Sequence, residues 1–474
     1  MRILLVSHRF LPAHAAGTEV YTGSLALALA ARGHEVHVLT AEKDVAREDL
    51  SVVRRTWSGI PVVELTNNLF HRTFRETWDQ PQIARAFAGE LERVRPDLVH
   101  VQHLMYLSIG CVEEAARRRL PVVFTLHDFW LQCPRFGQLV HADGALCSTV
   151  DFARCGTCLC SFKFRQSALE RNAARALAGF KRTLGIDLAA AARSTARAVG
   201  SARVRAGEGA APVDPDQARA FCSEAAERDA GLRSRLVPNV RRFVSPSRFL
   251  RDRMVAWGIA PAAIEVVPTG LELERFRTVA RTRRAGHGAN PLRVAFLGTL
   301  APHKGAHVAL AAWELLPSAL RSLARLEVRG PIAGSPEYHD DLLAAAARVG
   351  AEVGPPVARD EVPRFLSELD LLLVPSTWYE NAPLVILEAR AARTPLLVSA
   401  LGGMAELVAP GVHGEHFRAG EAADLARVAR AMLEDRERLS RYYAEAPPER
   451  DTREHVDELE SIYRALQLPA PPSA

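Results

Sequence analysis

The alternation of short apolar runs with longer amphipathic runs constrains this chain more than any other feature of its sequence. The chain begins with the apolar run RILLVS, followed by an amphipathic run from Glu19 to Arg32 and by a second apolar-rich run, GHEVHVLT. Short apolar runs separated by a helical pattern of this length are typical of parallel strands joined by a crossover helix. The opening segment therefore predicts a strand–helix–strand unit.

Further apolar runs continue this pattern in two separate series. The first series comprises PDLVHVQ, PVVFTLHD, RRFVSPS and IEVVPTG, and the second comprises LRVAFLG, ARLEVRG, LDLLLVPS and TPLLVSA. An Arg- and Gly-rich stretch at residues 277–290 separates the two and indicates a linker. A chain of 474 residues is also too long for a single core. We therefore predict an α/β protein with two doubly wound, Rossmann-like parallel sheets in tandem.

The predicted domains cover residues 1–285 and 286–450, and a helical pattern with a Pro-rich tail follows over residues 451–474. Residues 130–240 interrupt the first series of strands. This insertion begins with a cysteine-rich loop and continues with an Ala- and Arg-rich pattern that predicts one or two helices. The C-terminal helix can pack on either domain. The helices of the insertion can rest on anionic lipid or present their arginines to water.

Composition and charge favour a cytoplasmic protein. The formal net charge is +5, and the basic residues are mostly arginines spread along the chain, so nucleic-acid binding is not predicted. The first residues lack the extended apolar region and cleavage signal of a signal peptide. No apolar run approaches the roughly 18 residues that a membrane-spanning helix requires. We expect any membrane contact to be peripheral, on the inner face of the membrane.

Two glutamates, Glu380 and Glu388, bracket a mostly apolar stretch of seven residues just after a predicted strand that ends at Ser376. Open parallel sheets bind ligands at the carboxyl ends of their strands. Carboxylates accept hydrogen bonds from sugar hydroxyls, and a nucleotide sugar carries hydroxyls on both sides of its diphosphate. The spacing therefore predicts that the two glutamates hold different parts of such an elongated ligand.

A helix is expected between these two glutamates. Pro383 favours the first turn of a helix that continues over residues 384–392. The amides around Ala382 and Leu384 then point out of a helix N-terminus, where they can bind an anion such as a phosphate.

This stretch resembles the retaining glycosyltransferases of family 4 (glycosyl transferases group 1), whose GT-B fold has two Rossmann-like domains facing across a cleft. The family's hallmark is a glutamate, seven residues and a second glutamate, as in Glu380 and Glu388. The resemblance implies that Glu380 holds the transferred sugar and that Glu388 holds the nucleotide ribose. It also implies that Asn381, Ala382 and Leu384 lie at the donor.

Two glycine-containing loops carry the same resemblance. FLGTLAPHKGAHVAL resembles the family's phosphate-binding loop, in which Gly298 follows a strand and Lys304 neutralises the donor diphosphate. Thr299 stands where the family usually has arginine, so one charge on the phosphate is missing or comes from elsewhere, for example from His303. Gly17, after FLPAHAA, fits the glycine loop that approaches the diphosphate, although the family usually has two glycines there.

The stretch TLHDFW places His127 directly after a strand of the first domain. The resemblance implies that this histidine contacts the hexose of the donor, while Asp128 can orient it or cap the next segment. The stretches VSPSRFLRDRMVAWGI, VVPTGLELERF and LGGMAEL also fit the family's pattern. The resemblance covers residues 1–128 and 241–470 and leaves the insertion outside the shared core.

The resemblance implies a hexosyltransferase that moves a sugar from a UDP- or GDP-linked donor to a glycan or lipid-linked acceptor, with retention at the anomeric carbon. His127, Lys304 and Glu380 are then the catalytic residues. Lys304 and the helix N-terminus can stabilise the leaving phosphate, so no metal or other cofactor is required for the chemistry. Polysaccharide assembly is the implied setting. The alternatives are another GT-B enzyme, such as a sugar-nucleotide epimerase or a phosphorylase, and a catalytically silent scaffold that binds a partner through the cysteine-rich loop.

The cysteine-rich loop holds five of the seven cysteines of the chain, namely Cys133, Cys147, Cys155, Cys158 and Cys160. A Cys-x-x-Cys pair with two further thiolates is typical of a tetrahedral zinc site. We predict structural zinc, with an iron–sulfur cluster, reduced thiols or disulfides as alternatives. Five cysteines compete for four places, and His141 could also bind the metal. No open metal position beside a general base can be identified, which favours a structural role.

Overall fold

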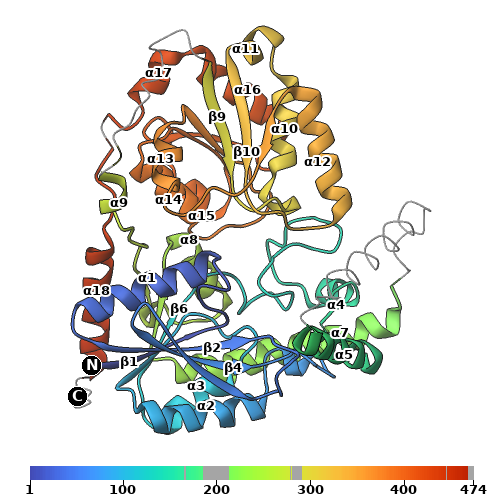
Figure 1. Cartoon of the computed structure of the whole chain (residues 1–474), viewed down its shortest axis with the longest axis vertical. Helices are drawn as coiled ribbons and strands as arrows, with labels where there is room; N and C mark the ends of the chain where they lie inside the picture. Colours follow the sequence, from blue (N-terminus) through green and yellow to red (C-terminus); the bar gives the residue numbers. More distant parts are fainter. Residues whose placement is uncertain (165–166, 185–212, 278, 280–290, 445, 468–474) are drawn as a thin grey trace. The chain divides into compact units, whose positions relative to one another are not determined.

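The computed structural model describes residues 1–164, 167–184, 213–277, 279, 291–444 and 446–467. The chain forms two compact units (Figure 1). The first comprises Met1–Pro246, Arg251–Val267 and Val456–Ala474, and the second comprises Ser247–Leu250 and Pro268–His455. The chain passes to the second unit at Pro268, before the boundary near residue 285 that the sequence predicts, because the first sheet is complete by then.

The first unit contains an eight-stranded sheet with the order β3-β4-β2-β1-β5-β6-β7-β8. The neighbouring strands are parallel except for β3 and β4. Parallel strands covered on both faces are apolar throughout, which makes them easy to find in a sequence. The strands are β1 (Arg2–Ser7), β2 (Glu35–Glu42), β3 (Val52–Trp57), β4 (Ile60–Thr66), β5 (Leu98–Val101), β6 (Val122–Thr125), β7 (Arg242–Ser245) and β8 (Ile264–Val266).

An antiparallel hairpin of β3 and β4, which the sequence analysis did not identify, forms one end of this otherwise parallel sheet. The turn residues Ser58 and Gly59 have φ angles of 47° and 83°, as a tight hairpin turn requires. Arg55 Nε donates a hydrogen bond to Glu64 Oε1 across the pair at 2.5 Å. Because β3 is an edge strand with exposed positions, it lacks the continuous apolar run on which the prediction relied.

The C-terminal helix α18 (Thr452–Gln467) packs on the first unit, which settles the alternative that the sequence left open. Its Val456, Leu459 and Tyr463 share one apolar core with Ile3 of β1 and with α1 (Gly17–Ala31). Figure 1 shows α2 (Pro81–Val94) and α3 (Gly110–Arg117) on the opposite side of the sheet from α1. Helices therefore cover both faces of the first sheet.

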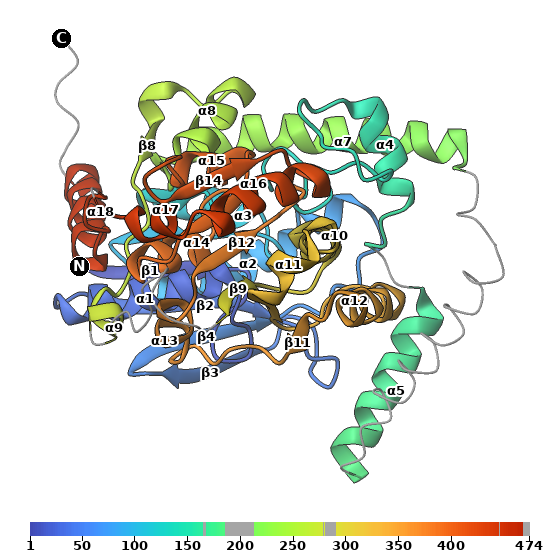
Figure 2. The ribbon, with the colours of Figure 1, turned by 90° about the horizontal axis from the view of Figure 1, so that it is seen from above.

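The insertion between β6 and β7 contains helices α4 (Phe152–Cys160), α5 (Ala168–Leu184) and α7 (Pro215–Gly231). Figure 2 shows α4 and α7 side by side. A Cβ atom on Gly156 of α4 would lie only 2.2 Å from the carbonyl oxygen of Ala218 in α7, so the glycine permits this close packing. Helix α5 is the first part of the predicted Ala- and Arg-rich helices, and their continuation in residues 185–212 lies outside the described residues.

The second unit contains a six-stranded parallel sheet with the order β11-β10-β9-β12-β13-β14. The sequence predicts its four central strands but not the two edge strands, which are short and carry polar residues. The strands are β9 (Leu292–Leu297), β10 (Ala324–Arg329), β11 (Glu352–Gly354), β12 (Leu371–Val374), β13 (Leu396–Ser399) and β14 (Gly414–Phe417).

Successive side chains of β12 point to opposite faces of the sheet and pack into two different hydrophobic cores. Leu371 and Leu373 pack with α10, α12 and α16, whereas Leu372 and Val374 pack with α13, α14 and α15. Figure 1 shows α10 and α12 beside this sheet, away from α13 and α14. The helices are α10 (Ala306–Leu315), α11 (Ser318–Ser322), α12 (Pro336–Val349), α13 (Val362–Ser367), α14 (Leu384–Ala391), α15 (Gly402–Leu407) and α16 (Ala422–Glu434).

The remaining elements are short or connect the sheets. They are α8 (Arg248–Trp257), α9 (Glu274–Arg277) and α17 (Arg436–Arg441), with the turns η1 (Arg75–Thr77), η2 (Leu232–Leu236), η3 (Val237–Asn239), η4 (Pro261–Ala263) and η5 (Pro302–Lys304). Within the described ranges, no helix has both the length and the apolar character needed to cross a membrane.

Candidate functional site

The carboxyl ends of β9 and β12 bring two loops of the second unit together. These strands are parallel neighbours, so both end at the same edge of the sheet. Gly298 and Thr299 follow β9 directly, and Lys304 lies further along the same loop. Glu380 lies in the loop after β12. The fold therefore gathers, at one edge, residues that are far apart in the sequence.

A tight turn holds Lys304 against the loop after β12. Gly305 follows Lys304 at a φ angle of 76° and precedes α10. A Cβ atom on Gly305 would lie 1.9 Å from the carbonyl oxygen of Pro375, so only glycine fits here. The amide of Thr377 donates to the carbonyl oxygen of His303 at 2.9 Å. The glycine of the Lys-Gly pair is thus required by the contact between the loops.

Lys304 and Glu380 form an ion pair with 2.5 Å between Nζ and Oε1. The same carboxylate oxygen accepts hydrogen bonds from Trp378 Nε1 at 2.7 Å and from Ser376 Oγ at 3.1 Å. Burial raises the pKa of Glu380, but the Lys304 ammonium and these hydrogen bonds outweigh it and hold the pKa below its usual value. Glu380 is therefore an ionised acceptor that the protein holds in one position.

His303 lies beside this ion pair as a neutral imidazole. Its ring is 3.6 Å from the Trp378 ring, measured between centroids, with the planes 31° apart. Burial, followed by the charge of Lys304, lowers the pKa of His303 to about 4. His303 therefore supplies no positive charge near neutral pH to replace the arginine that the family usually has at Thr299.

Helix α14 begins at Leu384, and Pro383 is its N-cap residue instead of lying in its first turn. Ala382 and Leu384 thus adjoin the start of the helix, as the sequence predicts. The helix dipole and the amides of the first turn favour an anion at this end. This N-terminus adjoins the loop that carries Glu380.

Asn381 and its neighbour Glu380 are held in place by contacts with Ser247 and Gly403. Ser247 Oγ donates to Asn381 Oδ1 at 2.5 Å. The amide of Gly403 donates to the carbonyl oxygen of Glu380 at 2.8 Å. A Cβ atom on Gly403 would lie 1.5 Å from the carbonyl oxygen of Asn381. Ser247 and Gly403, from the VSPS and LGG stretches, therefore position the loop that carries Glu380 and Asn381.

Glu388 lies one turn inside α14, in a different environment from Glu380. Burial raises the pKa of Glu388, although the charges of Arg359 and Arg275 oppose the rise. No ion pair within 4 Å is found for it among the described residues. The environments of the two glutamates therefore differ, because Lys304 helps to lower the pKa of Glu380 whereas burial raises the pKa of Glu388.

The first sheet also gathers polar residues at the carboxyl ends of its central strands. His8 follows β1, His103 follows β5, and His127 and Asp128 follow β6. His127 Nε2 lies 2.9 Å from Gln102 Oε1. The sequence analysis identified His127 but missed His8 and His103, although each follows an apolar strand in the same way. That shared position was the available signal.

Asp128 pairs with His103 and caps the next segment. The amide of Met105 donates to His103 Nδ1 at 2.9 Å, so Nε2 carries the proton that points to Asp128 Oδ2, 3.0 Å away. The amide of Trp130 donates to Asp128 Oδ1 at 2.8 Å. Burial raises the pKa of Asp128, but the interactions with His103 and this amide bring it below its usual value.

Several buried polar atoms at this edge have no hydrogen-bond partner among the described residues. They are Ser7 Oγ, His8 Nδ1, Glu19 Oε2 and Gln102 Nε2. His8 Nε2 lies 3.3 Å from Glu19 Oε1, so these groups are close together. Buried polar groups are normally hydrogen-bonded, and a group of exceptions indicates a place where a polar ligand or water binds.

Gly17 is the first residue of α1. Among the described residues, no atom lies within 4 Å of the position that its Cβ would take, and its φ angle is not positive. The first unit itself therefore does not require glycine at this position. The space above Gly17 is compatible with a ligand that approaches the backbone closely.

The five cysteines of the insertion differ in burial. Cys133, Cys147, Cys155 and Cys158 are buried, whereas Cys160 is partly exposed. As the side chains stand, no three His, Cys, Asp or Glu residues of the described ranges form a group that could hold a metal ion.

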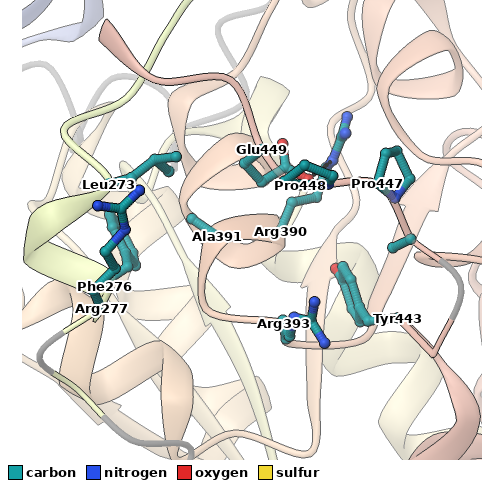
Figure 3. A pocket seen from close by; sticks show the side chains of 11 residues that line it. Leu273, Phe276, Arg277, Arg390, Ala391, Arg393, Tyr443, Pro447, Pro448 and Glu449 are labelled. Atoms are coloured by element: carbon teal, nitrogen blue, oxygen red, sulfur yellow. Dashed lines mark hydrogen bonds and ion pairs between the residues drawn. The ribbon is translucent and has the colours of Figure 1, made fainter. Parts of the chain in front are cut away.

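A separate pocket of about 230 Å³ lies elsewhere in the second unit (Figure 3). Arg390 and Glu449 line it and form an ion pair at 2.9 Å. Phe276 and Tyr443 contribute aromatic surface. None of the predicted donor-binding residues lines this pocket, so it is distinct from the candidate site.

Two family models match the chain. Residues 15–151 match Glycosyltransferase Family 4, and residues 281–448 match Glycosyl transferases group 1. A D-inositol 3-phosphate glycosyltransferase of Nocardia farcinica is 33% identical over 229 residues, which cover 46% of this chain and 50% of that protein. The corresponding protein of Rhodococcus opacus is 32% identical over 47% of this chain and 52% of its own length. The chain thus spans about half the length of the curated relatives it matches.

Solved structures with the same architecture match over nearly the whole chain. HepE of Anabaena in complex with UDP and glucose has a TM-score of 0.60 at 17% identity, covering 98% of this chain and 100% of that chain. A sucrose-phosphate synthase from Thermosynechococcus elongatus has a TM-score of 0.59 at 18% identity, covering 98% of each. At such identities the likeness shows the fold alone.

The two Rossmann-like units define a protein of the GT-B class, which confirms the fold prediction. With both family models matched, the chain belongs to the glycosyltransferases of family 4, also described as glycosyl transferases group 1. The resemblance inferred from Glu380 and Glu388 is therefore confirmed at the level of the family.

Proposed function

We propose that this chain transfers a hexosyl group from a UDP- or GDP-linked sugar to a glycan or lipid-linked acceptor, with retention at the anomeric carbon. The observation that carries the proposal is the Lys304–Glu380 pair, 2.5 Å apart, beside the N-terminus of α14. This arrangement offers a cation and helix amides to a diphosphate and an ionised carboxylate to sugar hydroxyls. HepE, which shares the fold, is a protein crystallised with UDP and glucose, which supports a nucleotide-sugar donor.

Lys304 neutralises the leaving diphosphate in this proposal. A unit charge pair at about 4 Å is worth roughly 4 kcal/mol at an effective dielectric constant near 20. Glu380 Oε1 already accepts three hydrogen bonds, so we assign Oε2 to a hydroxyl of the transferred sugar. Glu388 can accept hydrogen bonds from the ribose hydroxyls through its carboxyl oxygens.

Charge stabilisation by Lys304 and the α14 amides lets the leaving phosphate depart without a divalent ion. Retention then follows from attack on the face that the phosphate leaves, with a phosphate oxygen taking the acceptor's proton. Glu380 is bonded to Lys304, Trp378 and Ser376 through one oxygen, which suits a binding role better than a nucleophilic one.

The polar edge of the first sheet binds sugar hydroxyls in this proposal. His127 contacts the transferred hexose, as the family resemblance implies. The unpartnered atoms Glu19 Oε2, His8 Nδ1 and Gln102 Nε2 offer acceptors and a donor for further hydroxyls. A sugar placed here would satisfy groups whose burial otherwise costs free energy.

A lipid-linked acceptor would place the protein at the cytoplasmic face of a membrane, in polysaccharide assembly. Exposed apolar side chains on α5 support this peripheral contact, since Leu169 is 80% exposed and Phe180 is 49% exposed. The second candidate function is a silent scaffold that binds a partner through the cysteine-rich loop. Thr299 and the neutral His303 favour it, because together they leave the phosphate with one cation fewer.

Thermal stabilisation by a panel of UDP- and GDP-sugars, followed by a transfer or donor-hydrolysis assay, tests the proposal. Lys304→Met should abolish both the stabilisation and the turnover. Lys163→Met is the matched control, because Lys163 lies in the first unit with its side chain 70% exposed. A chain that binds no nucleotide sugar, or a Lys304→Met variant that turns over donor as fast as the wild type, would overturn the proposal.

A further inference from the structure

Helix α4 presents two cysteines on its buried side. Cys155 and Cys158 are three residues apart and therefore share one face of the helix. Each is only 6% exposed. Asp151 caps the helix by accepting a hydrogen bond from the Ala153 amide at 2.9 Å. Cys160 lies further along and is partly exposed, so it does not belong to this buried face.

A short hairpin before α4 carries one more buried cysteine, Cys147, and another, Cys133, precedes it. Val140 and Leu146 form an antiparallel bridge. The amide of Cys147 donates to the carbonyl oxygen of Leu139 at 2.8 Å, which fixes the end of the hairpin. Cys133 lies before the hairpin and is 7% exposed. Burial raises the pKa of Cys133, while backbone amides that donate to its sulfur act in the opposite direction.

The four buried cysteines form one cluster. Burial, followed by the neighbouring thiols of Cys133, Cys147 and Cys158, raises the pKa of Cys155 to about 12. Burial and the thiols of Cys133 and Cys158 likewise raise the pKa of Cys147. Among the described residues, no thiol acts on Cys160 in this way. The contacts of the hairpin agree with this grouping: the Cys147 amide bonds to Leu139, and His141 of the same hairpin lies 3.7 Å from Cys158 Sγ. Four of the five candidate cysteines are therefore buried around one hairpin, whereas Cys160 is partly exposed.

A buried arginine next to the cluster lacks a close counter-charge. Arg228 of α7 is 2% exposed and donates to the carbonyl oxygens of Trp130 and Leu131 at 2.5 and 3.3 Å. No carboxylate of the described residues lies within ion-pair distance of it, although Asp229 and Asp128 act on its charge from further away, as do Cys133 and Cys155. A buried charge is costly unless it is compensated, so a negative group is expected close to this guanidinium.

We propose that Cys133, Cys147, Cys155 and Cys158 bind one zinc ion as thiolates in a structural site that excludes Cys160. Four thiolates satisfy the tetrahedral preference of zinc and leave no open position for a catalytic water. The thiol protons pass to solvent when zinc binds, and the resulting site carries net negative charge. That charge would lie closer to the buried guanidinium of Arg228 than the carboxylates of Asp229 and Asp128 do, neither of which is within 4 Å of it.

Zinc binding requires a local change of side-chain rotamers. Cys147 Sγ donates to the carbonyl oxygen of Thr149 at 3.1 Å and must release this bond to face the other sulfurs. His141 Nδ1 lies 3.7 Å from Cys158 Sγ. We place His141 as a hydrogen-bond partner of a ligating sulfur and not as a ligand, since four cysteines already fill the coordination sphere.

The zinc site would support the polar edge of the first sheet. The turn after Cys133 ends at Gly137, whose amide donates to the Cys133 carbonyl oxygen at 3.2 Å. A Cβ atom on Gly137 would lie 2.8 Å from the Trp130 amide nitrogen and 3.2 Å from Asp128 Cγ. A fixed Cys133 therefore fixes the turn that contacts the aspartate paired with His103.

Metal analysis of the freshly purified full chain tests this site. We expect about one zinc ion per chain. Cys155→Ser and Cys158→Ser should lower the content below about one tenth of that value, because a missing thiolate opens the site. Cys160→Ser is the matched control on the same helix and should keep the wild-type content, as should His141→Gln.

Cobalt(II) reconstitution gives a second readout should the ligand variants fail to fold. The wild-type chain should then show intense thiolate-to-cobalt charge-transfer bands with tetrahedral visible bands, unchanged in Cys160→Ser. The proposal is wrong if purified protein contains iron with acid-labile sulfide, or less than about half an equivalent of zinc with freely titrating thiols. Loss of zinc in Cys160→Ser or His141→Gln would equally overturn the assigned ligand set.

Discussion

Lys304 Nζ and Glu380 Oε1 lie 2.5 Å apart, although 75 residues separate them in the chain and each comes from a different loop of the second sheet. Trp378 and Ser376 donate to the same carboxylate oxygen and hold it beside the lysine. A diphosphate that binds to Lys304 must therefore share this lysine with Glu380. In the proposed reaction, the carboxylate of Glu380 orients the lysine and so reduces the reorganisation needed in the transition state.

Glu380→Gln should lower kcat/KM for transfer by about 100- to 1000-fold, the range for loss of one preorganised charged group. The amide keeps the shape but removes the negative charge that positions Lys304 and binds the sugar. Glu388→Gln is the matched comparison on the same motif. We expect it mainly to raise KM, by about tenfold, because it loses a ribose contact and not a reacting-centre contact. Steady-state kinetics with a nucleotide sugar distinguish the two, and similar effects of both variants on kcat would contradict the assigned roles.

Thr299→Arg should strengthen donor binding. The residue directly follows Gly298 at the end of β9, and the neighbouring His303 is neutral. An added guanidinium can form a charge-assisted hydrogen bond with a phosphate, for which we expect about a tenfold lower Kd at low ionic strength and a smaller gain at high salt. Calorimetric titration with UDP measures the effect. Thr299→Gln adds length without charge, so an equal gain in that variant would refute the electrostatic explanation.

Acid should destabilise the second unit through His303. Burial, followed by the charge of Lys304, lowers the pKa of this residue to about 4 in the folded chain. An unfolded histidine has a pKa of about 6.5, so the unfolded chain binds the proton first as the pH falls. The contribution of His303 to stability is fully present above about pH 6.5 and is lost as the pH falls toward about 4.

We therefore expect His303→Gln to lose less Tm than the wild type between about pH 7 and pH 5. Both proteins should differ by a constant amount above neutrality, where His303 carries no proton in either state. Parallel Tm curves over the whole acidic range would show that His303 is not buried as a neutral group.

The sequence predicted the central strands of both sheets, because parallel strands that are buried on both faces appear as apolar runs. It also predicted the family, through the spacing of Glu380 and Glu388. It missed β3, which lies at the edge of the sheet with exposed positions and has no continuous apolar run. It also missed β4, although the buried run IPVVELT was an available signal. The edge strands β11 and β14 were also not predicted, because they are short and carry polar residues. Edge strands are specified by cross-strand partners, which a single sequence does not reveal.

The sequence identified several residues of the candidate site but not the contacts between them. Glu380, Lys304 and His127 follow strands and could be found from position alone. The pairing of Asp128 with His103, and not with its neighbour His127, depends on the order of β5 and β6 in the sheet. The choice of the four cysteines that we propose as zinc ligands was also beyond the sequence, because it depends on the burial of each thiol in the fold.

The packing of the C-terminal helix on the first unit gives a stability prediction. Tyr463 is fully buried, and its hydroxyl lies 2.6 Å from His100 Nδ1 in β5, while His100 Nε2 lies 2.7 Å from Thr125 Oγ1 in β6. Tyr463→Phe removes the hydroxyl from this chain of contacts and leaves His100 without that partner. We expect a loss of about 1–3 kcal/mol in the free energy of unfolding, measured by urea denaturation.

Tyr338→Phe is the control for this measurement. Tyr338 Oη lies 3.3 Å from His307 Nδ1 in an exposed contact of the second unit, so we expect a change within about 0.5 kcal/mol. A Tyr463→Phe variant as stable as the wild type would mean that α18 does not dock on β5 as described. Donor binding by the second unit should persist in Tyr463→Phe, because the lost hydrogen bond lies wholly within the first unit.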